Sequence, residues 1–293
     1  MPAPTSLSIL HLSDTHLFGD DSLHYGRVDT AAALARTLEQ FGGMGDLDLV
    51  VASGDLADDG SPRAYQRLRS ALEPWAADHG ARVVYAMGNH DDRDGFRQVL
   101  GSGHGPDVSI AAQGPVDAVS TLGSWRVVTV DSSVPGAGYG ELAPAQLDWL
   151  RAVLSEPAGA GTVLVMHHPP VSACTALLQA LELYNPEDLL EAIQGSDVRV
   201  ILSGHYHHPL REQFGAVPVI VTPGIANTTD VLAPEGTERA FIGSGATLVT
   251  VTGENVRSIP LRSYGDHDGA PLFHLDLDTV AQFVQEAGRV DTR

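Results

Sequence analysis

Residues 82–91 read Arg-Val-Val-Tyr-Ala-Met-Gly-Asn-His-Asp. The mainly apolar run predicts a β-strand, and the polar tetrapeptide Gly88-Asn89-His90-Asp91 follows it without helical spacing. Asn89 offers an uncharged oxygen to a metal ion, and His90 offers an imidazole that can bind a metal or transfer a proton. Gly88 would let the backbone turn tightly enough to aim both side chains. This segment therefore predicts a strand that delivers reactive groups to the edge of a sheet.

Four other predicted strands also end in residues that can bind a metal. The strand at 7–12 leads to Asp14 and His16, 48–52 to Asp55, 162–166 to His167, and 198–202 to His205 and His207. The two-residue spacing of Asp14 and His16 predicts that both point to one side of an extended chain. With Asn89, five loops supply two carboxylates, four imidazoles and one amide oxygen. That mixture favours two borderline divalent ions over calcium or a thiolate zinc site, and each ion receives four protein donors if Asp55 bridges them.

Such a site suits a phosphodiester. Two divalent ions and two carboxylates leave about two positive charges, which attract a phosphodiester monoanion. The ions would also lower the pKa of a bound water, so that the resulting hydroxide attacks phosphorus in line. No Ser, Cys or Lys nucleophile is then needed.

Other polar residues near these strand ends are candidates for supporting roles. His90 is the candidate catalytic residue, which would hydrogen-bond the phosphoryl group or protonate the departing alkoxide. Asp91 is expected to orient a histidine ring. Further candidates for supporting or substrate contacts are Asp58, His168 and His208, and loop residues that could touch substrate are His24, Tyr25, Asp131 and Tyr184.

Composition narrows the class of protein. The chain has 293 residues, 43% of them hydrophobic, and a formal net charge of -20, so a duplex nucleic acid or broad membrane footprint is disfavoured. All seventeen basic residues are arginines, which excludes a Walker lysine or a lysine Schiff base. The single Cys174 excludes an intramolecular disulfide. The N-terminal residues 1–6 lack a signal-peptide pattern and no long apolar run follows, which predicts a cytoplasmic protein without an integral membrane segment.

Strands and helices alternate along most of the chain, as expected for an α/β protein. A helical flap over the site is expected at 174–184, and short strands at 217–222, 246–252 and 256–261 suggest a second sheet. We expect a main domain at 1–262 and an extension at 263–293 that carries a short amphipathic helix at 277–288, capped by Asp278 or Thr279 and stopped by Gly288. The apolar stripe of that helix would dock on its own domain or, alternatively, form a homodimer contact.

Together these motifs resemble the calcineurin-like metallophosphoesterases over about residues 7–225. Neighbouring residues, including Asp131-Ser132-Ser133-Val134-Pro135-Gly136, are similar to the bacterial class III cyclic nucleotide phosphodiesterases, particularly the mycobacterial members. The resemblance implies a four-layer α-β-β-α sandwich of two mixed sheets with helices on both outer faces. It implies that one ion is held by Asp14, His16, Asp55 and His207, and the other by Asp55, Asn89, His167 and His205.

The resemblance also leads us to expect manganese or iron in the site, with zinc, cobalt or magnesium as alternatives. Purple acid phosphatases carry a tyrosine where this chain has Asp58, so a tyrosinate-stabilised ferric ion is not expected. The implied activity is hydrolysis of 3',5'-cyclic nucleotides such as cAMP. Alternatives are a broad phosphodiesterase or phosphomonoesterase acting on glycerophosphodiesters, nucleotides or phosphonate esters, and a metal-binding scaffold without catalysis.

Overall fold

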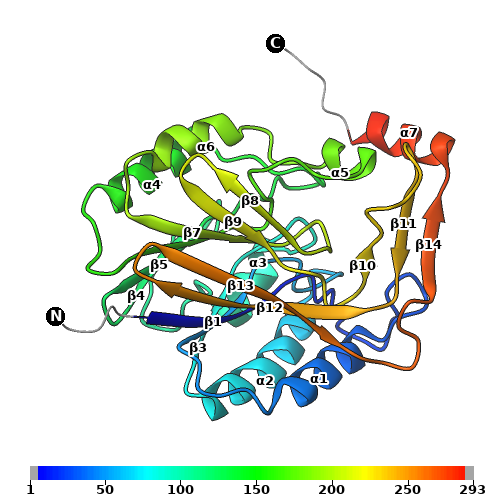
Figure 1. The fold of residues 1–293 in the computed structure, drawn as a ribbon, viewed down its shortest axis with the longest axis horizontal. Helices are drawn as coiled ribbons and strands as arrows, with labels where there is room; N and C mark the ends of the chain where they lie inside the picture. The colour runs from blue at the N-terminus through cyan, green and yellow to red at the C-terminus, as the bar shows by residue number, and fades with distance from the viewer. Residues whose placement is uncertain (1–5, 288–293) are drawn as a thin grey trace.

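The computed structural model describes residues 6–287, whose centre is a pair of face-to-face β-sheets (Figure 1). The first sheet has the order β13-β12-β1-β2-β3. Its strands are β1 (Ser6–Leu12), β2 (Leu49–Ala52), β3 (Arg82–Tyr85), β12 (Ser244–Thr252) and β13 (Asn255–Ser263). β1, β2 and β3 run parallel, whereas β12 is antiparallel to both β1 and β13, so this sheet is mixed.

The second sheet is also mixed and has the order β4-β5-β6-β7-β9-β8. Its strands are β4 (Ala118–Leu122), β5 (Trp125–Thr129), β6 (Gly161–Val165), β7 (Val198–Ser203), β8 (Leu210–Phe214) and β9 (Val217–Val221). The four central strands are parallel, and the edge strands β4 and β8 pair antiparallel. The carboxyl ends of the parallel strands in both sheets carry the predicted ligand loops.

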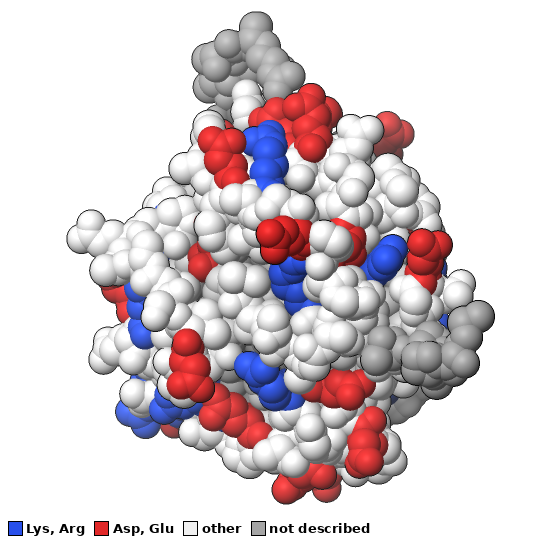
Figure 2. Space-filling view, turned by 90° about the vertical axis from the view of Figure 1, so that its left-hand side faces the viewer, with Lys and Arg blue, Asp and Glu red and all other residues white. Residues whose placement is uncertain are grey.

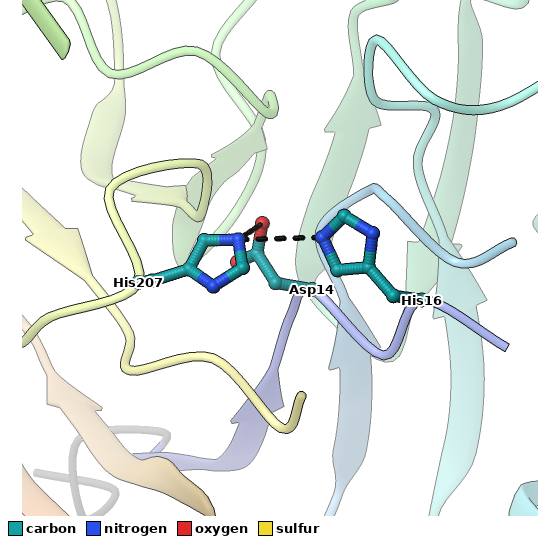
Figure 3. A group of neighbouring side chains, drawn as sticks. All are labelled: Asp14, His16 and His207. Carbon is teal, nitrogen blue, oxygen red and sulfur yellow. Dashed lines mark hydrogen bonds and ion pairs between the residues drawn. The ribbon is translucent and has the colours of Figure 1, made fainter. Parts of the chain in front are cut away.

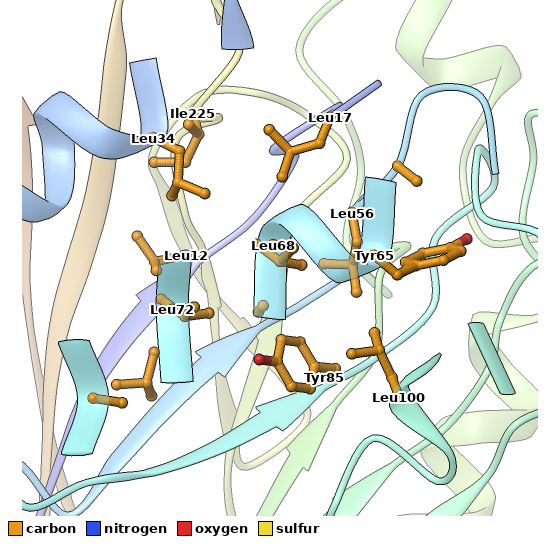
Figure 4. Packing of buried hydrophobic residues seen from close by; sticks show 14 of the residues in the cluster. Leu12, Leu17, Leu34, Leu56, Tyr65, Leu68, Leu72, Tyr85, Leu100 and Ile225 are labelled. Atoms are coloured by element: carbon orange, nitrogen blue, oxygen red, sulfur yellow. The ribbon is translucent and has the colours of Figure 1, made fainter. Parts of the chain in front are cut away.

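Alternation along the strands fills three apolar layers. In β1, Leu7 and Ile9 enter the core between the sheets, while Leu10 and Leu12 face the helices on the outside. The outer helices of the first sheet are α1 (Thr30–Phe41) and α2 (Pro62–Asp78), and those of the second are α4 (Pro144–Leu154) and α6 (Pro186–Ile193). Figure 4 shows Leu68 and Leu72 of α2 packed near Leu12. The four-layer sandwich is thereby confirmed.

A small third sheet stands beside the sandwich. It consists of β10 (Thr228–Thr229), β11 (Glu238–Phe241) and β14 (Pro271–Leu275). The short helix α5 (Ala176–Ala180) packs against the C-terminal helix α7 (Leu277–Glu286), at the upper right of Figure 1. The remaining helix, α3 (Arg93–Leu100), packs on α2.

Several local predictions need correction. The expected flap helix at 174–184 is only the five-residue α5. The late strands do not form one sheet, because β9 joins the second sheet while β12 and β13 complete the first. The side chain that caps α7 is Asp276, which accepts a hydrogen bond from the Thr279 amide, rather than Asp278 or Thr279. The expected stop at Gly288 lies outside the described residues, and the domain boundary at 262/263 stays a prediction.

The surface carries mixed charge. On the described part of the face in Figure 2, arginine side chains lie singly among aspartates and glutamates. None of the helices within residues 6–287 is long and apolar enough to cross a membrane. Residues 1–5, on which the signal-peptide expectation partly rests, lie outside the described chain.

Candidate metal centre

The predicted ligand residues gather just beyond the carboxyl ends of five strands. Asp14 and His16 follow β1, Asp55 follows β2, Asn89 follows β3, His167 follows β6, and His205 and His207 follow β7. Two glycines allow these loops to approach closely. A Cβ on Gly88 would lie 2.3 Å from the Asp55 amide nitrogen, and one on Gly204 would lie 1.8 Å from Ser13 Oγ. The reason for Gly88 is therefore this close approach rather than the tight turn predicted from the sequence.

Asp14, His16 and His207 form the first group of ligand atoms (Figure 3). The Nε2 atoms of His16 and His207 face each other at 3.3 Å, and His207 Nε2 lies 3.2 Å from Asp14 Oδ1. Both rings point inward over the Asp14 carboxylate. The arrangement leaves three ligand atoms converging on one point.

Asp55, His167 and His205 form the second group. Asp55 Oδ2 lies 3.3 Å from His167 Nε2 and 3.7 Å from His16 Nε2, so this carboxylate stands between the two groups. Asn89 Oδ1 is buried and makes no hydrogen bond to any described residue. An amide oxygen left in this way is suited to a cation.

Hydrogen bonds orient the imidazoles. Asp58 Oδ1 lies 2.8 Å from His16 Nδ1, and the Ser53 carbonyl lies 3.0 Å from His167 Nδ1, which frees Nε2 of both rings. The Leu181 carbonyl lies 3.0 Å from His205 Nε2, which leaves Nδ1 of that ring for an ion. Sequence reasoning missed the roles of Ser53 and Leu181, because any residue type can supply a carbonyl.

The backbone is strained at most of these positions. Six non-glycine residues among those described have positive φ, and five of them are Asp14 (54°), His16 (42°), Asp55 (48°), His205 (70°) and His207 (54°). Left-handed backbone is uncommon outside glycine and clusters at functional sites. Asp14 and His16 do point to the same group of ligand atoms, as predicted, but left-handed backbone at both residues aims them there rather than the extended chain that the spacing assumed.

Burial and the two carboxylates set the electrostatics. Asp14 and Asp55 are 0% and 2% exposed. Burial disfavours a charged imidazole, yet Asp55 and then Asp14 raise the pKa of His167 to about 9. Burial lowers the pKa of His16 to about 4 and of His205 to about 3. Two buried carboxylates beside four imidazoles form a donor set that fits divalent cations, and in the absence of metal a proton on His167 offsets part of the charge.

The residues predicted to support the ligands differ in what they contact. Asp58 contacts His16 as described, whereas Asp91 orients no histidine ring and instead accepts hydrogen bonds from the amides of Leu56, Ala57 and Gly88. Asp91 therefore fixes the two loop backbones, and the predicted ring contact was wrong. His168 is fully buried, with Nδ1 2.8 Å from Ser132 Oγ and Nε2 3.2 Å from the Gly138 carbonyl.

His208 and His90 differ from the buried ligands. His208 stacks on Tyr206, and no direct contact with the two ligand groups is seen for it among the described interactions. The His90 side chain is 43% exposed, with its amide bonded to Asp55 Oδ1 and its Nδ1 3.7 Å from Asp58. It also lies near enough to His16 and Asp55 to form a further potential ligand group.

The sequence matches one protein family over most of its length. Residues 7–209 match the family described as Calcineurin-like phosphoesterase. The chain belongs to this family, whose members use a dinuclear metal site and hydrolyse phosphoric esters.

Individual relatives are similar over most of both chains. A probable cyclic nucleotide phosphodiesterase of Rhodococcus erythropolis is 42% identical over 250 residues, covering 85% of this chain and 81% of the relative. A cAMP/cGMP dual specificity phosphodiesterase of Mycobacterium tuberculosis is 40% identical, covering 85% and 77%. Pseudomonas aeruginosa has a 3',5'-cyclic adenosine monophosphate phosphodiesterase, CpdA, that is 31% identical, covering 74% and 76%.

Solved structures agree in fold. A dimetal phosphatase from Danio rerio superimposes with a TM-score of 0.58 at 17% identity, covering 89% of this chain and 100% of that one. A purple acid phosphatase from yellow lupin gives a TM-score of 0.62 at 13% identity, covering 89% and 52%. At these identities the comparison shows the shared fold alone.

Proposed function

We propose that this protein is a dinuclear-metal phosphodiesterase that hydrolyses 3',5'-cyclic nucleotides such as cAMP. The observation that carries the proposal is the pair of neighbouring ligand groups beyond the strand ends of both sheets, with the unpartnered Asn89 Oδ1 on one of the same loops. The names of the relatives from Rhodococcus and Mycobacterium support the cyclic nucleotide as substrate.

In this proposal Asp14, His16, Asp55 and His207 hold one ion, and Asp55, Asn89, His167 and His205 hold the other. Manganese or iron is the preferred metal, because imidazole and carboxylate donors suit borderline divalent ions. When bound, the two ions supply a neutral-pH nucleophile from water and stabilise the charge that develops at phosphorus. The first set comes from three loops, because Asp14 and His16 share the one after β1, and the second set comes from four, so the fold fixes their spacing.

His90 is the proposed general acid. Its backbone amide is tied to Asp55, while its side chain stays at the rim with 43% of its surface exposed. There the protonated imidazole can give its proton to the alkoxide that leaves when the phosphorus–oxygen bond of the cyclic diester breaks. Asp58, whose Oδ1 is 3.7 Å from His90 Nδ1, would hold the ring in place.

Net charge limits the substrate to a small anion. Two divalent ions with Asp14 and Asp55 leave about two positive charges in the site, which attract the single negative charge of a diester. The chain as a whole carries a formal charge of -20, so polyanions such as duplex nucleic acid are repelled before they reach it.

A substrate panel tests the proposal. The manganese-loaded protein is assayed with cAMP, cGMP, bis(p-nitrophenyl) phosphate and p-nitrophenyl phosphate. We expect kcat/KM to be highest for a cyclic nucleotide. Higher kcat/KM for the linear diester or the monoester would favour the broad-specificity alternative, and no turnover of any compound would favour the scaffold alternative.

A further inference from the structure

An apolar pocket lies beside the metal centre, between the third sheet and the segment that carries α5. Its volume is about 500 Å³. It is lined chiefly by Tyr25, Leu177, Leu181, Phe273 and Phe283, and Glu286 is the one charged residue among the described residues of its lining. The C-terminal elements β14 and α7 thus supply one wall, and α5 and the residue after it supply another. The lining favours an uncharged group with a large apolar surface.

Residues that line the pocket are connected to both groups of candidate ligands. On one side the Tyr25 ring lies edge-on to the His24 ring at 4.6 Å, and His24 lies 4.7 Å from the His16 ring. On the other side, Leu181 lines the pocket, and its backbone carbonyl accepts a hydrogen bond from His205 Nε2 at 3.0 Å. A molecule whose phosphate sits at the metal centre therefore has this pocket within reach of its organic portion.

Tyr25 is held toward the pocket at a conformational cost. It is the sixth described non-glycine residue with positive φ (50°), and the other five are all candidate ligands. Bulky aromatic residues are rarely found in this region, and such strain is typical of ligand clamps. Tyr25 is nevertheless 61% exposed, and its ring centroid lies 4.8 Å from that of Phe273 with a 45° angle between the ring planes. This aromatic pair, with Tyr25 exposed and Phe273 half-buried, leaves surface on which another flat ring can stack.

We infer that this pocket binds the aromatic base of the nucleotide, with Tyr25 and Phe273 as residues that determine specificity. The inference rests on the proposed function and deepens it. It also gives residues 271–287 a role, because they form the wall that faces Tyr25. Glu286 would repel an anionic group, so the occupant is an uncharged ring rather than a second phosphate.

Two ligands that differ only in the base test the inference. Adenosine 5'-monophosphate and ribose 5-phosphate carry the same sugar and phosphate, and both can be titrated calorimetrically into the full-length, manganese-loaded protein. We expect the nucleotide to bind at least tenfold more tightly. Tyr25→Ala and Phe273→Ala should each reduce this preference about five- to tenfold, the usual scale of a lost base–aromatic contact.

The matched control is Tyr264→Ala. Tyr264 is 69% exposed and does not line the pocket, so this variant should keep the wild-type preference. Tyr25 is also largely exposed, so its replacement leaves the core intact even if Phe273→Ala fails to fold. Equal affinities of the wild-type protein for the two ligands, or an unchanged preference in Tyr25→Ala, would overturn the inference. Because calorimetry needs no turnover, this failure is distinct from a failure to hydrolyse cAMP.

Discussion

For His90, a single substitution can distinguish a role as metal ligand from a role as general acid. We expect His90→Ala to keep both ions and to lower kcat for cAMP about 10²–10⁴-fold, since the leaving 3'-alkoxide needs a proton. A p-nitrophenolate leaving group needs little help, so the loss for bis(p-nitrophenyl) phosphate should be far smaller. Elemental analysis and kcat measurements on the same preparation check both points, with the exposed His267 replaced by alanine as the control.

Loss of an ion from His90→Ala would contradict this role. It would place His90 among the ligands, as its proximity to His16 and Asp55 allows. An equal loss of kcat for both substrates would likewise argue against proton donation, because leaving-group basicity would then be irrelevant.

At the residue scale, the sequence predicted which residues are candidate ligands better than it predicted which side chains and amides the supporting residues contact. The candidate ligands follow strand ends, and this is visible locally because an apolar run stops at Asp, His or Asn. The separate contacts of Asp58 and Asp91 could not be predicted, because they depend on how three loops meet. Asp58 reaches His16 across 42 positions, and Asp91 reaches the Leu56 amide across 35.

At the element scale, His104 ties the loop after α3 to the edge of the second sheet. Its Nδ1 lies 2.7 Å from Ser120 Oγ of β4, and its Nε2 lies 3.0 Å from Thr129 Oγ1 of β5. The ring is 2% exposed, and burial, followed by the charge of Arg82, lowers its pKa from 6.5 to about 4. The folded protein therefore holds this imidazole neutral where the unfolded chain would protonate it.

This difference predicts a pH dependence of stability. Between pH 6.5 and about 4 the unfolded state binds a proton at His104 that the folded state does not. The contribution of His104 to the free energy of unfolding is therefore fully present above pH 6.5. About 3 kcal/mol of it is lost as the pH falls toward 4. Urea unfolding from pH 7.5 to 4 should show a shallower loss for His104→Gln than for the wild-type protein. His267→Gln, at an exposed position, should follow the wild type, and identical curves for His104→Gln would refute the assignment.

The sequence predicted which segments form strands better than it predicted which strands pair with each other. The apolar runs of β12 and β13 indicated strands. However, β12 pairs with β1, which brings together residues that are far apart in sequence, such as Ile9 and Val249. No local pattern specifies such a pairing. The small sheet of β10, β11 and β14 was not predicted, for the same reason. Its short strands lack a clear alternation of apolar and polar residues in the sequence, and they pair only in the folded chain.

At the scale of the whole molecule, the sandwich brings loops from both sheets to one place. Asp14, Asp55 and Asn89 come from the first sheet, and His167, His205 and His207 from the second. The site therefore exists only when the two sheets are packed together. The contact between Tyr25 and Phe273 adds the C-terminal segment to this arrangement, and neither the sequence motif nor the family core includes it.

The proposed metal centre holds two ions that share Asp55. Elemental analysis of the manganese-reconstituted protein measures this directly: we expect two ions per chain in the wild-type protein and one in Asn89→Ala, because Asn89 is proposed as a ligand of the second ion alone. Asn255→Ala, at an exposed strand end, should retain two. One ion or none in the wild-type protein, or two in Asn89→Ala, would contradict this dinuclear assignment.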